Sequence, residues 1–314
     1  VPSARRDNHM PEESASVSAP SSSTAPSDSP GSRQHSSLTG VLPSPSRSWE
    51  IARMELRRGY RWVRHQDFWL AFTVLMGVLS VFFLLQTFDA ARSVGSALAA
   101  GETVPAWLLT ATSVLWVFLT ILLVADGFGS NGDLDNGGQY LTIRPAADVA
   151  GGLLLAAAAK FSVYTIGLGL AAGAGLAVGV GSALPLFGIT AAAVAIPATA
   201  AAVGYPIAFA LKGFVRRSET LGRLTTVLGV GIGFAYVSLS VTGELLTVVD
   251  RLEPVLQSPP VAWFGHLALV TTPNAGLDPT GALVLLGLGP VLVVGGTALS
   301  VPAARYAWLA DSAR

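Results

Sequence analysis

Six long runs of apolar residues, separated by polar connections, occupy the chain between Phe68 and Ala304. An α-helix of about 20 apolar residues is long enough to cross the hydrocarbon core of a bilayer. Helices span membranes because they satisfy their own backbone polar groups where no water is present. The runs therefore predict an all-α polytopic membrane protein with six transmembrane helices.

The predicted spans differ in composition. The third and fourth are long and rich in Gly and Ala, and Pro197 and Pro206 should bend the fourth. The spans are expected at about 68–88, 104–125, 152–180, 185–211, 224–249 and 281–304.

The composition excludes several classes of protein. Only 12% of the 314 residues are charged, whereas soluble domains average about 25%. The net charge of zero argues against a nucleic-acid partner, and the absence of Cys excludes disulfides and thiolate metal sites.

Changes in composition divide the chain into four segments. Residues 1–48 form a Ser- and Pro-rich tail that is typical of disorder, because it contains few large apolar residues to bury. Residues 49–67 are predicted to form an amphipathic elbow helix, and residues 68–310 the six-helix transmembrane domain. Residues 311–314 are a short C-terminal end.

The basic residues indicate how the spans are oriented, because cytoplasmic connections carry the excess of Lys and Arg. The N-terminal flank, alternate connections and the C-terminal end hold most of these residues, whereas the opposite side holds only Arg92 and Arg251. Both termini are therefore expected in the cytoplasm, with the protein integral to the cell (plasma) membrane. An even number of spans requires the same arrangement.

The elbow helix is predicted from two stripes at helical spacing. Ser48 is its expected N-cap, and one stripe is apolar while a second beside it is basic. Such a helix can lie on the cytoplasmic face with its arginines toward lipid phosphates; the alternative is a charged flank that only sets topology. The apolar stripe contains Trp49, Ala52, Leu56, Tyr60 and Val63, and the basic stripe contains Arg53, Arg57, Arg61 and Arg64.

Glycines in the third span predict close helix packing. Gly169 and Gly173 are four residues apart, as are Gly175 and Gly179. Small residues at this spacing let helix backbones approach each other within a bilayer. We expect these positions to serve packing rather than motion.

Motifs of enzymatic chemistry are missing from the sequence. It contains no zinc-protease motif, no nucleophile elbow and no nucleotide-binding loop. Asp133 and Asp135 begin a pattern typical of a calcium loop, but Arg144 occupies the position where the bidentate Glu is required. The chain is therefore predicted not to be an enzyme and to hold no cofactor of its own.

Two ionisable residues and one apolar segment remain as features of the spans and their edges. Glu244 near the end of the fifth span is an intramembrane candidate for a functional site, or else bonds to a neighbouring helix or reaches outer-surface water. Lys160 in the third span can extend to the cytoplasmic surface. The apolar stretch 261–272 is too short to span, so it predicts a re-entrant or interfacial helix anchored at the headgroups by Trp263 and Phe264.

In this order, the elements resemble the permease subunit of an ABC-2 type ABC transporter. The resemblance rests on the basic helix with Ile51-Ala52-Arg53-Met54-Glu55-Leu56-Arg57-Arg58, on the acidic Gly-rich loop that leads into Leu141-Thr142-Ile143-Arg144-Pro145, and on the apolar segment between spans 5 and 6. It covers about residues 49–310 and depends on the order of elements more than on single residues.

The resemblance implies an exporter built from a homodimer of permeases and two copies of a separate ATPase that binds ATP and Mg. The elbow helix and the connection between spans 2 and 3 would contact the ATPase. On this chain the contact would involve Arg53, Arg57, Arg61, Asp133, Asp135 and Arg144.

A second hypothesis belongs to a different class. The chain could be a non-transporting membrane protein, an assembly or sensor subunit that acts through partner binding. The sequence does not distinguish the cargo, although its few polar residues within the spans favour lipid-like or amphipathic molecules over ions.

Overall fold

A computed structural model describes residues 42–64, 67–129, 145–218, 241–273 and 275–308, with positions 220, 231, 234 and 237–238 between them. The chain divides into two units, 1–36 and 37–314, and the structure below belongs to the second. Predictions for most of the tail, for the loop at 130–144, for most of the fifth span and for residues 311–314 lie outside the described residues.

Every regular element in the described part of the chain is an α-helix, as predicted. The helices are α1 (Pro45–Arg64), α2 (Asp67–Ala99), α3 (Ala106–Phe128), α5 (Ala146–Val180), α6 (Leu184–Arg217), α8 (Glu244–Leu256), α9 (Trp263–Leu269) and α10 (Thr280–Trp308).

Five of these helices are long and apolar enough to cross a membrane, which indicates an integral membrane protein. They are α2, α3, α5, α6 and α10, and they coincide with the first, second, third, fourth and sixth predicted spans. The fifth predicted span falls largely on residues outside the described ranges, so the total of six remains a prediction.

Helix α2 continues well beyond the apolar run that predicted it. The run was expected to end at Phe88, but the helix continues to Ala99. Asp89 and Arg92 end the hydrophobic pattern. The helix continues through them because both residues can adopt helical backbone angles. The helix ends where Gly101 adopts a positive φ of 92°.

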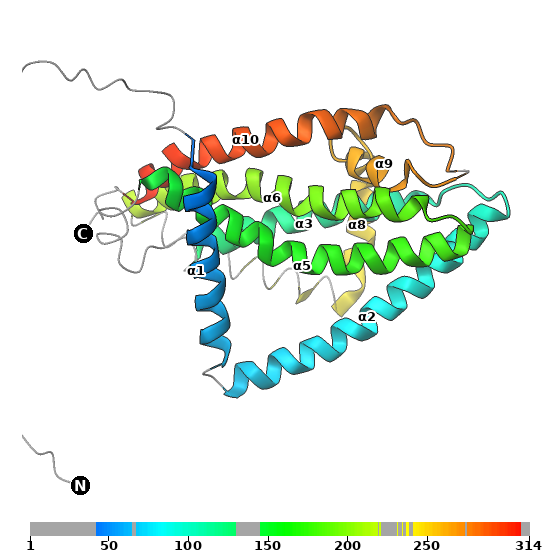
Figure 1. The fold of residues 1–314 in the computed structure, drawn as a ribbon, viewed down its shortest axis with the longest axis horizontal. Coiled ribbons are helices and arrows are strands. Elements are labelled where there is room, and N and C mark those ends of the chain that lie inside the picture. The colour runs from blue at the N-terminus through cyan, green and yellow to red at the C-terminus, as the bar shows by residue number, and fades with distance from the viewer. Residues whose placement is uncertain are drawn as a thin grey trace, which may run out of the picture. The chain divides into compact units, whose positions relative to one another are not determined.

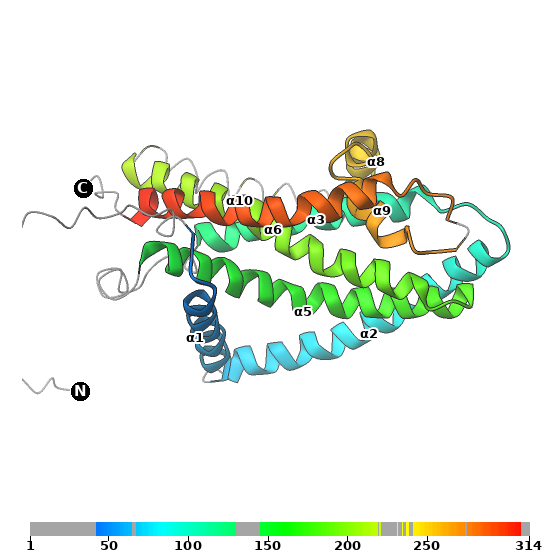
Figure 2. The same cartoon turned by 45° about the horizontal axis from the view of Figure 1, so that its top comes forward.

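Helix α6 is at the centre of the bundle and contacts α3, α5, α9 and α10. Figure 1 shows α3, α5, α6 and α10 running alongside one another, whereas α2 leans away from α5 at its N-terminal end. The turned view in Figure 2 agrees, and in both views α1 crosses the end at which α5 begins.

The two small-residue pairs of α5 face different neighbours. Side-chain methyl groups at Gly169 and Gly173 would collide with Ala193 and Leu186 of α6. The other pair faces α2, where a methyl group at Gly179 would meet backbone atoms around Arg92 and Gly95, and one at Gly175 would meet the backbone of Phe88. The six-residue offset between the pairs rotates them to different sides of the helix, so α5 packs closely against two helices.

The face on which α1 packs differs from the predicted apolar stripe. Ile51 and Ala52 are buried, whereas Trp49 and Tyr60 are exposed. The reason lies in α5, where Gly151 and Gly152 leave room for Pro43, Ser48 and Ile51. The expected N-cap at Ser48 is also wrong, because α1 begins at Pro45 and Ser48 lies within the helix.

Both prolines within α6 leave backbone carbonyls without their usual helical donors. Pro197 frees the carbonyl of Ala193, and the hydroxyl of Thr165 in α5 donates to it at 2.8 Å. Pro206 frees the carbonyl of Ala202, which lies against Gly296 of α10. Neighbouring helices therefore cover both places at which α6 breaks its own hydrogen-bond ladder.

Candidate functional site

The predicted ATPase-contact residues are only partly described by the structure. Arg53, Arg57 and Arg61 are exposed along α1. Asp133, Asp135 and Arg144 lie in the loop outside the described residues, so their contacts stay predictions.

The Asp148 cluster, which comprises Ser44, Arg47, Ser48 and Asp148, attaches α1 to α5. The Ser44 N–H donates to Asp148 Oδ1 at 2.7 Å, and the Ser48 hydroxyl donates to the Asp148 carbonyl at 3.3 Å. The guanidinium of Arg47 lies 3.5 Å from Asp148 Oδ2, although Oδ2 has no hydrogen-bond partner of good geometry among the described residues. Because Asp148 is buried in the first turn of α5, these contacts fix the start of α1 to the start of that span.

The Asp126 cluster, which comprises Asp126, Lys160 and Tyr205, joins three helices. Asp126 in α3 accepts from Lys160 of α5 at 3.2 Å and from the hydroxyl of Tyr205 of α6 at 2.9 Å. The Asp126 side chain is 12% exposed and the Lys160 side chain 49% exposed. Lys160 is therefore half exposed and bonds a carboxylate, while its extension to the cytoplasmic surface stays a prediction. The sequence did not indicate that Asp126 and Tyr205 meet.

A further bond holds the first residue after α3. The buried ammonium of Lys212 in α6 donates to the carbonyl of Gly129 at 2.9 Å. The backbone that leads into the 130–144 loop is thus held against α6 one helical turn beyond the Asp126 cluster.

Glu244 is the first residue of α8 and is exposed. It follows Gly243, whose positive φ of 75° separates α8 from the helical residues before it. One continuous helix to residue 249, as the fifth predicted span implied, is therefore wrong: a left-handed glycine interrupts it.

The predicted headgroup anchors behave differently from each other. Phe264 in α9 is only 3% exposed, and its ring stacks on Trp116 of α3 with centroids 5.4 Å apart. Its assignment as a headgroup anchor is wrong, because the ring is enclosed by protein. Trp263 is partly exposed and lies next to Gly281 of α10. Helix α9 packs against α3, α6 and α10.

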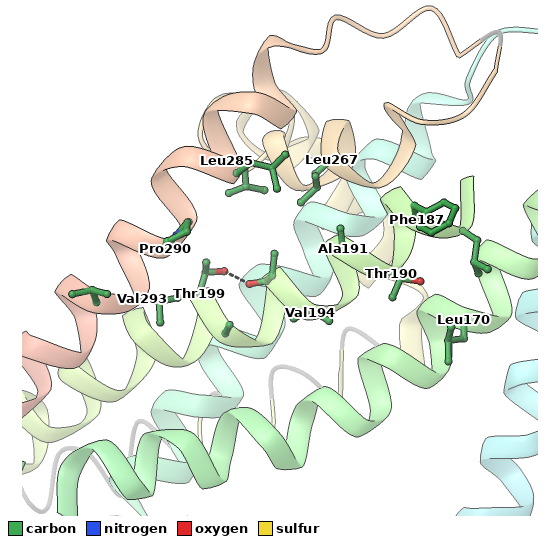
Figure 3. A pocket seen from close by; sticks show the side chains of 16 residues that line it. Leu170, Phe187, Thr190, Ala191, Val194, Thr199, Leu267, Leu285, Pro290 and Val293 are labelled. Carbon is green, nitrogen blue, oxygen red and sulfur yellow. Dashed lines mark hydrogen bonds between the residues drawn. The ribbon is translucent and has the colours of Figure 1, made fainter. Parts of the chain in front are cut away.

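An apolar cleft of about 850 Å³ opens between α6 and α10 (Figure 3). Leu170 of α5 and Leu267 of α9 complete its walls. The residues from α6 are Leu186, Phe187, Thr190, Ala191, Val194, Ala195, Ala198 and Thr199, and those from α10 are Leu285, Leu286, Gly289, Pro290, Val293 and Val294.

The walls of the apolar cleft carry no ionisable side chain. The hydroxyl of Thr199 is already used, since it accepts from Trp116 Nε1 at 3.0 Å and donates to the Ala195 carbonyl at 2.7 Å (Figure 3). Apart from the hydroxyls of Thr190 and Thr199, the described lining offers no side chain that could act as an acid, a base or a nucleophile. The cleft can hold an apolar group, and the sequence did not predict it, because its residues are typical of helix packing.

Among the residues that the structure describes, no group of three His, Asp or Glu side chains could hold a metal ion. Comparison with protein-family models, with curated proteins and with solved structures finds no match to this chain.

Proposed function

We propose that this chain is the permease subunit of an ATP-driven exporter that resembles the ABC-2 type, located in the plasma membrane with both termini in the cytoplasm. A separate ATPase chain would bind ATP and Mg, and two permeases would assemble with two ATPases. The observation that carries the proposal is that polar contacts attach both predicted ATPase-contact elements to α5, one at the start of α1 and one at the end of α3 that leads into the 130–144 loop.

The first attachment is that of α1. Its start is held to α5 by the Asp148 cluster, while Arg53, Arg57 and Arg61 farther along the helix are exposed. A partner bound to these arginines would displace α1, and α1 would transmit the displacement to α5.

The second attachment lies where the chain leaves α3 for the 130–144 loop. The Asp126 cluster and the bond from Lys212 to Gly129 connect this point to α5 and α6. A force on the loop would therefore act on α5, as a displacement of α1 would, and also on α6. Rigid-body helix movements of this kind are a known basis for switching between conformations.

Helix α2 is consistent with assembly of a larger unit. None of the most apolar 18-residue window of its candidate span is buried within the single chain. Lipid or a second permease would cover these side chains, and we propose that a second copy of the chain covers part of them.

Binding to the ATPase tests the proposal directly. The full chain, purified in native detergent, is mixed with ATPases identified by a nucleotide-binding loop encoded beside its gene, and co-elution and permease-dependent ATP hydrolysis are measured. We expect both with the wild type, and loss of both in the triple variant Arg53→Glu, Arg57→Glu, Arg61→Glu. A control, Arg92→Glu with Arg251→Glu, changes exposed arginines on the predicted opposite side and should bind normally.

Two results would count against the proposal or against part of it. If no ATPase associates with the wild-type chain, the alternative of a non-transporting assembly or sensor subunit gains support. If the control variant loses binding as completely as the triple variant, α1 is not the contact surface.

A further inference from the structure

The apolar cleft between α6 and α10 has the position and chemistry of a lipid-binding site. We propose that it holds one acyl chain of a membrane phospholipid as a fixed component of the folded protein. The inference does not depend on the proposed transport function, since it uses only the membrane setting and the walls of the cleft.

The cleft lies at hydrocarbon depth. Its lining residues occupy the first halves of α6 and α10, both of which are candidate membrane spans. Leu186 to Thr199 corresponds to about 20 Å along the helix axis. One leaflet of a hydrocarbon core is about 15 Å deep, so the cleft is long enough to follow an acyl chain through a leaflet.

The lining selects an uncharged, apolar occupant. A charged group in this cleft would be desolvated without an opposite charge among the lining residues, which is strongly unfavourable. Only two lining side chains carry a hydroxyl, Thr190 and Thr199, and that of Thr199 already makes two hydrogen bonds, so the walls offer water few partners. An empty cleft would in turn forfeit dispersion contacts along its walls.

The rim of the cleft is apolar and exposed. Phe187 is 67% exposed and Leu286 55% exposed, and both lie on its walls. The backbones of α6 and α10 come together at Ala202 and Gly296, which closes the cleft at that end. The polar N-terminal tail offers no apolar segment to fill it. Where α6 and α10 cross a bilayer, lipid hydrocarbon is the apolar medium next to this exposed rim.

The α6 wall of the cleft is held in place by hydrogen bonds to other helices. The Thr165 hydroxyl covers the carbonyl freed by Pro197, which supports α6 at its bend. Trp116 fixes Thr199 from the far side of α6. Since packed helices do not deform continuously, the cleft is preformed rather than created by its occupant.

The test uses the whole chain in nanodiscs of phosphatidylcholine that contain a phospholipid with a photoactivatable diazirine in one acyl chain. After illumination, labelled positions are mapped by mass spectrometry. We expect labelling to concentrate on the first halves of α6 and α10. The double variant Ala191→Phe, Ala195→Phe fills the cleft and should reduce that labelling by about tenfold, which corresponds to about 1.4 kcal/mol of binding free energy.

A second variant distinguishes obstruction of the cleft from misfolding of the protein. Val194 lies on the wall and is 47% exposed, so Val194→Trp can obstruct the opening without needing internal space, and it should reduce labelling as well. The matched control is Val163→Trp on α5, which is 71% exposed and lies outside the cleft; it should label like the wild type. Labelling spread evenly over all exposed helix faces, or unchanged in a folded Val194→Trp protein, would overturn the proposal.

Discussion

The contact between α5 and α2 can be tested with two glycine substitutions on the same helix. A methyl group at Gly179 would lie 2.8 Å from Gly95 Cα and from the Ser96 nitrogen, both backbone atoms of α2. A methyl group at Gly167 would find only the end of the Leu84 side chain, at 3.9 Å. Gly179→Ala must therefore displace α2, whereas Gly167→Ala displaces nothing.

The two variants share one energetic term and differ in another. Replacing Gly by Ala within a helix stabilises it by about 1 kcal/mol. Overpacking a close contact costs about 1–3 kcal/mol, and backbone atoms cannot move aside as a flexible side chain can. We therefore expect Gly179→Ala to be less stable than Gly167→Ala by about 1–3 kcal/mol.

The free energies of unfolding are measured by titrating the two purified variants with denaturing detergent and following helicity by circular dichroism. Because the propensity term is common to both, their difference isolates the packing term. Equal stabilisation in the two variants would refute the close approach of α5 and α2, and with it the role assigned to the Gly175 and Gly179 pair.

Three further tests concern polar side chains. In a double-mutant cycle, Asp126→Ala and Tyr205→Phe should show a coupling of at least about 0.5 kcal/mol, since the two side chains share one hydrogen bond; additive effects in unfolding titrations would contradict it. Thr272 is 5% exposed and its hydroxyl has no partner among the described residues, so Thr272→Val should raise stability by about 1 kcal/mol, and a lower thermal midpoint would contradict this. Asp278 accepts from the backbone N–H and the hydroxyl of Thr280, and these bonds lower the pKa of its carboxyl below the usual 3.8. Its stabilisation is present above that value and is lost as pH falls through the lower folded pKa, so Asp278→Asn should make thermal midpoints less sensitive to acid; an unchanged pH profile would exclude this contribution.

Sequence patterns were sufficient where the determining property is local. An apolar run within a bilayer must form a helix, because its backbone N–H and C=O groups can find hydrogen-bond partners only within the segment. Most ends of α3, α5, α6 and α10 therefore lie within a few residues of their predicted positions. The end of α2 was not, since loss of hydrophobicity at Asp89 does not end a helix.

Contacts between helices could not be predicted from the sequence alone. Asp126, Lys160 and Tyr205 are separated by 34 and 79 residues along the chain, and their meeting depends on the rotation of three helices about their axes. The buried face of α1 likewise follows from the space above Gly151 and Gly152 rather than from its own stripe of apolar residues.

The sequence by itself determined an all-helical chain with long apolar spans, because that outcome depends only on the composition of each segment. Tertiary structure decided the burial of Phe264, the polar clusters at the ends of α3 and α5, and the cleft between α6 and α10. Each of these depends on the distance and orientation between segments that are far apart in the chain, and close packing of small residues sets those quantities.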